Sequence, residues 1–231
     1  MVAALHCAAL RLPIAGIWQI NPDMPALLAQ FNFAININRF IGIFMSIINT
    51  QVQPFKVQAF KNGKFIEVTD ADLKGKWSVL VFMPAAFTFN CPTEVEDAAD
   101  NYPAFQKLEA EVYVVTTDSH FAHKVWHETS PAVGKAKFAL VGDPTHQLTR
   151  MFGVHIEEEG MALRGTFLVD PDGVVKTAEI HDNSIARDMI ETLRKLKAAQ
   201  YVAKNPGQVC PAKWNEGAKT LTPSLDLVGK I

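Results

Sequence analysis

The sequence predicts an α/β fold with a mixed central β-sheet flanked by helices. A short apolar run at 77–83 (WSVLVFM) indicates a central strand that is buried on both faces. From about residue 45 onward, strand patterns and helix patterns alternate along the chain. Near the C-terminal end, the turn at 170–173 (DPDG) predicts an antiparallel hairpin, so the sheet should be mixed rather than all parallel.

Six segments have the composition of strands, with β-branched or aromatic residues in alternating or mainly apolar runs. They are 64–69, 77–83, 111–117, 138–141, 166–169 and 174–180. The first alternates polar and apolar residues, as a half-buried strand does. Because helix patterns separate most of these strands, the α/β class is favoured over an all-β fold.

Four helices are expected. The first should follow Cys91, because Pro92 suits a first helical turn and the Thr93-x-x-Glu96 spacing resembles a capping pattern. Pro103 should break or kink this helix. The other three are expected from a cap at Ser119 to about 129, over 144–152 up to Gly153, and over 184–204.

The bulk composition excludes several classes of function. The 231 residues carry 22 basic and 24 acidic side chains, with no basic stripe for nucleic acid and no polybasic cluster for a membrane surface. No apolar run reaches the roughly 18 residues that a membrane helix needs. The three cysteines, Cys7, Cys91 and Cys210, are too few for a secreted disulfide scaffold. We therefore expect a reducing compartment, the cytoplasm.

The chain divides into three parts. Residues 1–44 contain few charges and are interpreted as a non-native or disordered extension, such as an upstream start codon would add, with Met45 as the natural first residue. An amphipathic anchor or a dimerising arm is the alternative. Residues 45–204 form the expected domain. Residues 205–231 are richer in Pro and Gly and are expected to be a tail that packs on the domain or on a partner.

Cys91 is the main candidate for chemistry. It lies between a predicted central strand and the helix that follows, which is the thioredoxin-like arrangement. A helix N-terminus stabilises a thiolate through its free amides and its positive dipole end. Thr88 offers a hydroxyl, and Pro84 and Pro92 limit the freedom of the segment between them. A buried structural cysteine is the alternative, and a Cys-Pro pair alone would favour it.

Three motifs together resemble one known family. The segment 84–91 (PAAFTFNC) has the P-x-x-x-T-x-x-C pattern of peroxiredoxins, and 209–214 (VCPAKW) is similar to the resolving-cysteine segment of typical two-cysteine peroxiredoxins. The end of the chain, 221–231, resembles that of the bacterial alkyl hydroperoxide reductase C type. The resemblance is continuous from about residue 45. It implies a thioredoxin-like fold and a thiol peroxidase of antioxidant defence.

The resemblance implies a two-cysteine cycle. Cys91 would be the peroxidatic cysteine, which reduces hydrogen peroxide or an organic hydroperoxide and becomes a sulfenic acid. Cys210 of the partner subunit would resolve it by forming an intersubunit disulfide. No cofactor is implied. An external reductase, either an NADH-dependent flavoprotein or thioredoxin, would reduce the disulfide.

The resemblance also implies roles for four further residues. Thr88 would hydrogen-bond the peroxide, and Pro84 would shield the pocket. Arg164 would stabilise the thiolate and the developing oxyanion, and Glu94 would orient that arginine. Independently, breaking an O–O bond moves negative charge onto the leaving oxygen, so a fixed cation aimed at it lowers the barrier.

The chain departs from the family pattern at several positions. Met83, Ala86 and Asn90 replace residues that are common in the family, and we expect them to tune the rate or the peroxide preference. Ala122 replaces a threonine that is often found at the contact between dimers. We expect this replacement to affect the stability of a pentamer of dimers but not that of the homodimer. The Gly-Gly-Leu-Gly and Tyr-Phe motifs of members prone to over-oxidation do not occur, so resistance to over-oxidation is expected.

Three other interpretations stay open. His120, His123 and His127 have the spacing of one helix face and could bind a metal, although a half-exposed face without metal is the favoured interpretation. The apolar N-terminal segment would suit a holdase that exposes apolar surface. A thioredoxin-like disulfide reductase would need a second cysteine where Glu94 stands.

Overall fold

A computed structural model describes residues 46–230, so the interpretation of residues 1–44 as an extension lies outside the described residues. The described part contains a seven-stranded sheet in the order β2-β1-β5-β4-β3-β8-β9. Its strands are β1 (Lys56–Lys61), β2 (Lys64–Thr69), β3 (Trp77–Phe82), β4 (Ala110–Thr116), β5 (Ala139–Gly142), β8 (Arg164–Val169) and β9 (Val175–His181). β4 is parallel to β3 and β5, whereas the other pairs are antiparallel. The predicted α/β fold with a mixed sheet is confirmed.

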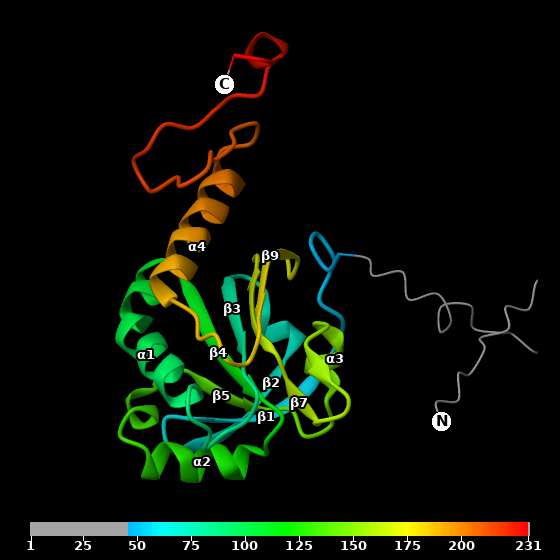
Figure 1. The fold of residues 1–231 in the computed structure, drawn as a ribbon, viewed down its shortest axis with the longest axis vertical. Coiled ribbons are helices and arrows are strands. Elements are labelled where there is room, and N and C mark those ends of the chain that lie inside the picture. Colours follow the sequence, from blue (N-terminus) through cyan, green and yellow to red (C-terminus); the bar gives the residue numbers. More distant parts are fainter. Residues whose placement is uncertain (1–45, 231) are drawn as a thin grey trace, which may run out of the picture. The chain divides into compact units, whose positions relative to one another are not determined.

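Strand β3 is buried along its whole length, as its apolar sequence predicted. Val79 and Val81 pack into a core with α1 (Cys91–Lys107), α2 (His120–Thr129) and α4 (Met189–Lys204). Leu80 and Phe82 pack into a second core, which includes residues of α3 (Gln147–Met151). Figure 1 shows α1 and α4 on the same side of the sheet. Because successive side chains of a strand point to opposite faces of the sheet, β3 contributes residues to both cores.

Helix α1 follows Cys91 as predicted, but it does not break at Pro103 and continues to Lys107. Proline in a helix removes one hydrogen bond, and packing of the neighbouring Tyr102 and Phe105 in the core offsets that loss. The predicted cap was also wrong. Thr93 lies in the first turn, and its hydroxyl donates to the carbonyl of Asn90 at 2.7 Å.

The other helices differ from the predictions mainly in where they begin. α2 starts after Ser119, whose hydroxyl accepts the Ala122 amide, as predicted. α3 is shorter than 144–152, because the Asp143 carboxylate accepts amides at the helix start and keeps the residues before it in a turn. α4 begins later than residue 184, after its N-cap Asp188. The residues before that cap form a loop that carries Arg187.

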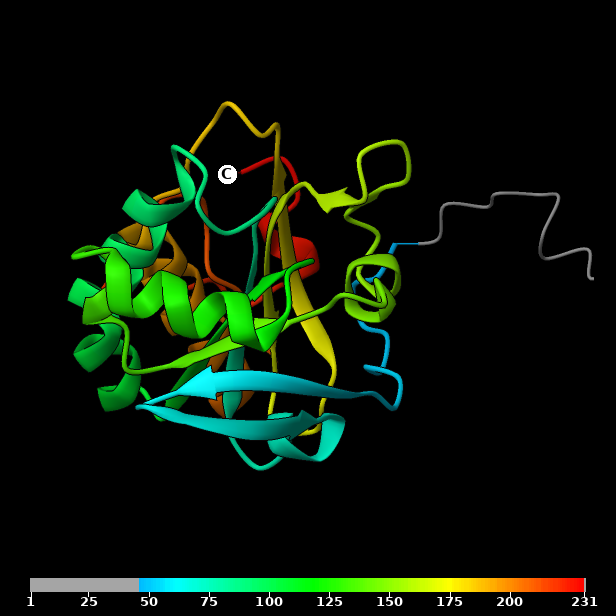
Figure 2. The ribbon, with the colours of Figure 1, turned by 90° about the horizontal axis from the view of Figure 1, so that it is seen from below.

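Three strands had no counterpart in the sequence prediction. They are β1, β6 (His155–Ile156) and β7 (Met161–Ala162). β1 joins β2 to the rest of the sheet, and Figure 2 shows this pair beside α2. β6 and β7 form a separate two-stranded hairpin just before Arg164. Met161 of this hairpin lines a pocket that is described with the candidate site.

The segment after α4 packs partly against that helix. Arg194 of α4 donates to the Trp214 carbonyl at 2.9 Å, and the Trp214 ring lies 5.1 Å from that of Tyr201. An isolated bridge joins Val209 to Leu221. Between residues 46 and 230, no helix has the length and hydropathy required to cross a bilayer.

Candidate active site

The loop from Pro84 to Asn90 connects β3 to α1 and ends at Cys91, the first residue of that helix. The Cys91 side chain is fully buried. Its Sγ accepts a hydrogen bond from Nη1 of Arg164 at 3.5 Å. The antiparallel register, with Val81 opposite Thr166, places the first residue of β8 beside the end of β3, where the loop begins. Sheet topology thus brings together two residues that are distant in sequence.

Glu94 lies one turn into α1 and is buried between two arginines. Its Oε2 accepts from Arg164 Nη1 at 2.6 Å, and its Oε1 accepts from Arg187 Nε at 2.8 Å. Burial alone would raise the pKa of Glu94, but hydrogen bonds and charges from Arg187 and Arg164 outweigh burial and lower that pKa. Burial would lower the pKa of Arg164, and the neighbouring Glu94 charge raises it instead. Both groups therefore keep their charge.

Arg187 was missed by the sequence analysis, which placed it inside a predicted helix over 184–204. Besides Glu94, it binds the Gly165 carbonyl through Nη1 at 2.7 Å. Asp188 is a good N-cap residue, and its side chain accepts the Ile190 amide. A cap at Asp188 would have placed the helix start after Arg187 and left this arginine in the loop.

A pocket of about 320 Å³ opens beside this cluster. Its wall combines apolar and polar side chains: Pro84, Thr88, Phe89, Asn90, Glu159, Met161, Arg164 and Asn183. Thr88 donates its hydroxyl to the Ala85 carbonyl at 3.1 Å. Arg164 both lines the pocket and contacts Cys91, so it links the open space to the buried sulfur. Five of the six predicted site residues are thus brought together.

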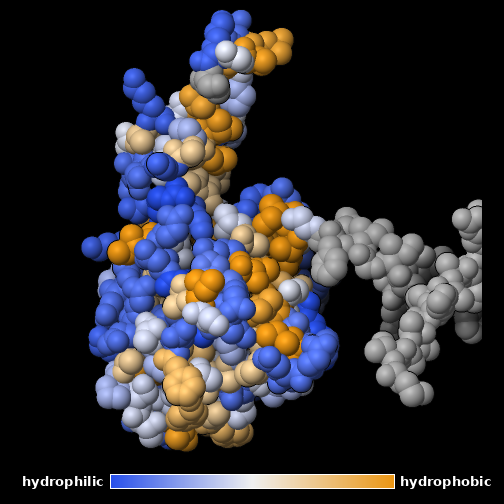
Figure 3. Space-filling view, in the orientation of Figure 1, coloured by the Kyte–Doolittle hydropathy of each residue, from blue (hydrophilic) through white to orange (hydrophobic). Residues whose placement is uncertain are grey.

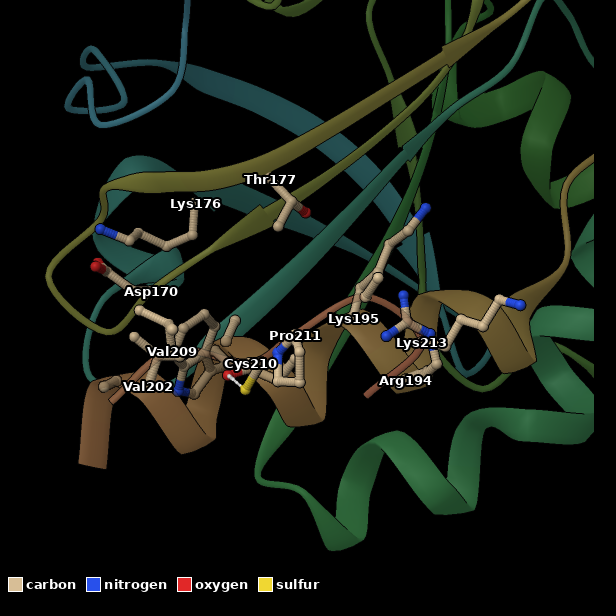
Figure 4. A pocket seen from close by; sticks show the side chains of 15 residues that line it. Asp170, Lys176, Thr177, Arg194, Lys195, Val202, Val209, Cys210, Pro211 and Lys213 are labelled. Atoms are coloured by element: carbon tan, nitrogen blue, oxygen red, sulfur yellow. Dashed lines mark hydrogen bonds between the residues drawn. The ribbon is translucent and has the colours of Figure 1, made fainter. Parts of the chain in front are cut away.

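The sixth predicted residue, Cys210, lies elsewhere. Its Sγ is 3.9 Å from the Ala198 carbonyl of α4, beside a hollow of about 560 Å³. Figure 4 shows Cys210 next to α4, with Lys176 and Thr177 of β9 across this hollow. Burial raises the pKa of the Cys210 thiol, although the nearby Arg194 charge acts in the opposite direction. Within one chain, Cys210 is not part of the Cys91 site.

The half-exposed histidine face predicted on α2 forms only in part, because His120 and His127 are partly exposed but His123 is not. His123 is fully buried, with Nε2 2.7 Å from Thr116 Oγ1 and Nδ1 3.2 Å from the Leu140 carbonyl. Burial lowers its pKa to about 4. His127 contacts the Ala136 carbonyl. Over the described residues 46–230, no three His, Cys, Asp or Glu side chains are grouped as a metal site would require.

A thiol buried at the start of a helix and held against a fixed arginine, on this mixed sheet, is the arrangement of the peroxiredoxins. These are thiol peroxidases with a thioredoxin-like fold. Residues 48–178 match the AhpC/TSA family, and residues 198–230 match the C-terminal domain of 1-Cys peroxiredoxin. The chain belongs to the AhpC/TSA family, as the sequence motifs predicted.

Curated relatives and solved structures agree. Alkyl hydroperoxide reductase C of Pseudomonas aeruginosa is 78% identical over 187 residues, which cover 81% of this chain and 100% of the relative. The Escherichia coli K12 protein of the same name is 58% identical with the same coverage. The crystal structure of Enterococcus faecalis AhpC has a TM-score of 0.71 and 44% identity, over 72% of this chain and 100% of that one. Reduced 2-Cys peroxiredoxin of Plasmodium vivax has a TM-score of 0.75 and 29% identity, over 79% of this chain and 96% of that one.

Proposed function

We propose that Cys91 is the peroxidatic cysteine and reduces hydrogen peroxide and alkyl hydroperoxides. The observation that carries this is the 3.5 Å contact between Arg164 Nη1 and Cys91 Sγ. The thiolate sulfur attacks the terminal peroxide oxygen and the O–O bond breaks. The leaving oxygen takes up a proton and departs as water or alcohol, while Cys91 becomes a sulfenic acid. Sulfur loses the two electrons that the peroxide gains.

The proposed roles of the neighbouring residues follow from their positions. Arg164 holds a positive charge where the thiolate reacts and where charge develops on the leaving oxygen. Glu94 fixes the arginine through its 2.6 Å bond. Thr88 presents its hydroxyl to the peroxide from the pocket wall, and Pro84, which is buried beside it, keeps bulk water away.

We propose that Cys210 of the partner subunit resolves the sulfenic acid. Its thiolate attacks the Cys91 sulfur, the S–O bond breaks, and the departing hydroxide takes up a proton from solvent and leaves as water, which gives an intersubunit disulfide. Within one chain the two sites lie near different parts of α4: Arg187 contacts Glu94 just before the helix, whereas Cys210 contacts Ala198. At 1.5 Å per residue, these points are about 15 Å apart along the helix axis. This separation favours the cysteine of another chain.

A homodimer is part of the same proposal. β9 forms one edge of the sheet, and exposed edge strands readily pair with a second copy. Ile180 of β9 and Ile185 of the loop that follows are about half exposed, at 48% and 57%. In Figure 3, apolar side chains are exposed in the region of β9 and along the C-terminal segment. A second apolar surface, where Phe65 and Phe121 are in ring contact, supports further assembly into a pentamer of dimers.

The oxidised enzyme needs an external disulfide reductase, which we propose to be an NADH-dependent flavoprotein or thioredoxin. The name of the relatives, alkyl hydroperoxide reductase C, supports alkyl hydroperoxides as substrates. A reductase of this kind works in a reducing compartment, for which we propose the cytoplasm. Because α4 ends at Lys204, we further propose residues 45–204 as the peroxidase domain and residues 205–231 as the tail that brings Cys210 to its partner.

The test is complementation between two inactive variants, Cys91→Ser and Cys210→Ser. In a cross-subunit cycle, a mixed dimer has one complete site, so a 1:1 mixture should regain about a quarter of the native turnover after random exchange of subunits. Each variant alone should show no turnover with the reductase. A mixture that stays inactive would reject resolution by the partner subunit, and full activity of Cys91→Ser would reject the peroxidatic role.

A further inference from the structure

Buried polar side chains lie directly behind the active-site loop. The backbone N–H of Ala86, in the middle of this loop, donates to Asp118 Oδ2 at 2.6 Å. Asp118 lies between β4 and α2, far from the loop in sequence. An amide hydrogen bond to a carboxylate is stronger than one between neutral groups, so this contact is a firm anchor for the loop.

The Asp118 carboxylate is itself held from behind. Thr116 Oγ1 lies 2.7 Å from the same Oδ2, and the Asp118 amide donates to that hydroxyl at 3.2 Å. Thr116 Oγ1 also lies 2.7 Å from His123 Nε2. Thr116 and His123 are both fully buried. The hydroxyl therefore joins the carboxylate to an imidazole that water does not reach.

His123 completes the connection to the core of the sheet. Its Nδ1 faces the Leu140 carbonyl of β5 at 3.2 Å, so each ring nitrogen has a polar neighbour. Asp118, Thr116 and His123 thus link β5, α2 and β4 to the loop. These three residues are called the loop anchor below. None of them contacts Cys91 or Arg164 in the hydrogen bonds of the described residues.

One peptide group transmits the effect of the loop anchor to Thr88. The Ala86 N–H that binds Asp118 and the Ala85 carbonyl that accepts the Thr88 hydroxyl belong to the same planar peptide. Fixing the N–H in one direction fixes the C=O in the other. The next residue, Phe87, has a positive φ of 59°, a conformation that non-glycine residues adopt only when their surroundings hold them. Without the anchor, the only remaining hydrogen bond of this peptide among the described residues would be the one from the Thr88 hydroxyl.

We propose that Asp118, Thr116 and His123 are positioning residues, which orient the Ala85–Ala86 peptide so that the Thr88 hydroxyl faces the peroxide. The inference rests on the proposed role of Thr88. The anchor acts on peroxide positioning and leaves the Cys91 thiolate unchanged, because Arg164 and the start of α1 hold the sulfur separately. Misplacing a reacting group by about 1 Å can cost as much as a hundredfold in rate.

The experiment compares two reactions of the same sulfur in the full chain. Hydrogen peroxide needs the Thr88 hydroxyl, whereas alkylation of the Cys91 thiolate by iodoacetamide, measured on the Cys91 peptide by mass spectrometry, does not use that hydroxyl. Thr116→Val keeps the side-chain shape and removes the hydroxyl, and Thr116→Ser restores it. We expect Thr116→Val to slow peroxide reduction by roughly ten- to a hundredfold and to alter alkylation less than about twofold. Thr116→Ser should recover most of the peroxide rate.

A double-variant cycle separates this proposal from the role of Thr88 itself. If both residues act through one hydroxyl, Thr88→Val combined with Thr116→Val should be no slower than Thr88→Val alone. A native peroxide rate in Thr116→Val, or an equal loss in both reactions, overturns the loop anchor. A native rate in Thr88→Val instead overturns the proposed role of Thr88. Should Thr116→Val not fold, Asp118→Ala, at a partly buried site, is assessed by the same two rates.

Discussion

One nitrogen of Arg164, Nη1, lies 3.5 Å from Cys91 Sγ and also donates to Glu94 Oε2 at 2.6 Å. The shorter contact fixes the guanidinium, and the longer one directs its charge at the sulfur. Arg187 donates to both carboxylate oxygens, to Oε1 through Nε at 2.8 Å and to Oε2 through Nη2 at 3.0 Å, so Glu94 is held from two sides. An ion pair that is fixed before the substrate arrives costs no reorganisation when charge develops on a leaving oxygen.

Replacing Arg164 should therefore slow the first chemical step. Arg164→Gln removes the charge, and we expect the second-order rate constant for hydrogen peroxide to fall by about 10²- to 10³-fold, as when one donor to a developing oxyanion is lost. The rate constant of Arg164→Lys should lie between those of the native protein and Arg164→Gln, because lysine offers a point charge without a planar fork. Stopped-flow peroxide reduction measures both. Arg150→Gln, at an exposed pair with Glu157, should leave the rate unchanged.

Glu94→Gln should destabilise the protein in a pH-dependent way. Removing one partner of a buried ion pair leaves two arginines uncompensated and should cost about 3–5 kcal/mol at pH 7. The pKa of Glu94 is lowered in the folded state, so its stabilising effect is complete above the unfolded value of 4.5. That effect disappears as the pH falls through the lower folded pKa. The difference in free energy of unfolding between native and variant proteins, measured in urea, should therefore shrink below pH 4.5; a constant gap contradicts this.

The sequence predicted most of the candidate site because much of it is local. Pro84, Thr88 and Cys91 share one loop, and the spacing alone places them before a helix. Arg164 was found only through the family resemblance, since no local pattern links residue 164 to residue 91. The contact depends on the pairing of β8 with β3, and strand pairing is a property of the whole sheet.

What the sequence analysis missed depends on tertiary contacts that override local signals. The predicted helix over 184–204 ignored Arg187, whose hydrogen bonds to Glu94 keep the preceding loop out of the helix. Of the break or kink expected at Pro103, the break did not occur, because core packing of α1 offsets one lost hydrogen bond. His123 has the spacing of a surface stripe, yet it is fully buried, with Nε2 beside Thr116 Oγ1 and Nδ1 beside the Leu140 carbonyl.

Gly165→Ala should disturb the ion pairs of Glu94 with Arg164 and Arg187 through packing alone. A Cβ at this position would lie 2.7 Å from the Phe167 ring and 2.8 Å from Val154 Cγ1, both in the core. Overpacking of this kind typically costs about 1–3 kcal/mol. A backbone movement that relieves these contacts would also move the Gly165 carbonyl, which accepts a hydrogen bond from Arg187. Thermal unfolding should show a lower Tm, together with a slower peroxide reaction. An unchanged Tm would mean that the neighbours yield freely.

The fate of Cys91 at high peroxide should depend on Cys210. Sulfenic acid that is not captured by a thiol reacts with a second peroxide and becomes sulfinic acid. In Cys210→Ser, sulfinic acid at Cys91 should therefore accumulate early in a peroxide titration followed by mass spectrometry. In the native protein the disulfide should form first, and sulfinic acid should appear only at large excess. Early sulfinic acid in the native protein would contradict the expected resistance to over-oxidation.

Disulfide formation should become faster as the pH rises, because the attacking group is the Cys210 thiolate. Burial raises the pKa of this thiol, so only a small fraction is ionised at neutral pH, and the rate should rise with that fraction up to the pKa. The Arg194 charge lowers the same pKa, so Arg194→Gln should shift the rate profile to higher pH. Arg194→Lys keeps the charge while losing Nη1, which donates to the Trp214 carbonyl, and it should retain the native profile if charge is the cause. If both variants shift equally, the packing of the tail, rather than the charge of Arg194, controls the reactivity of Cys210.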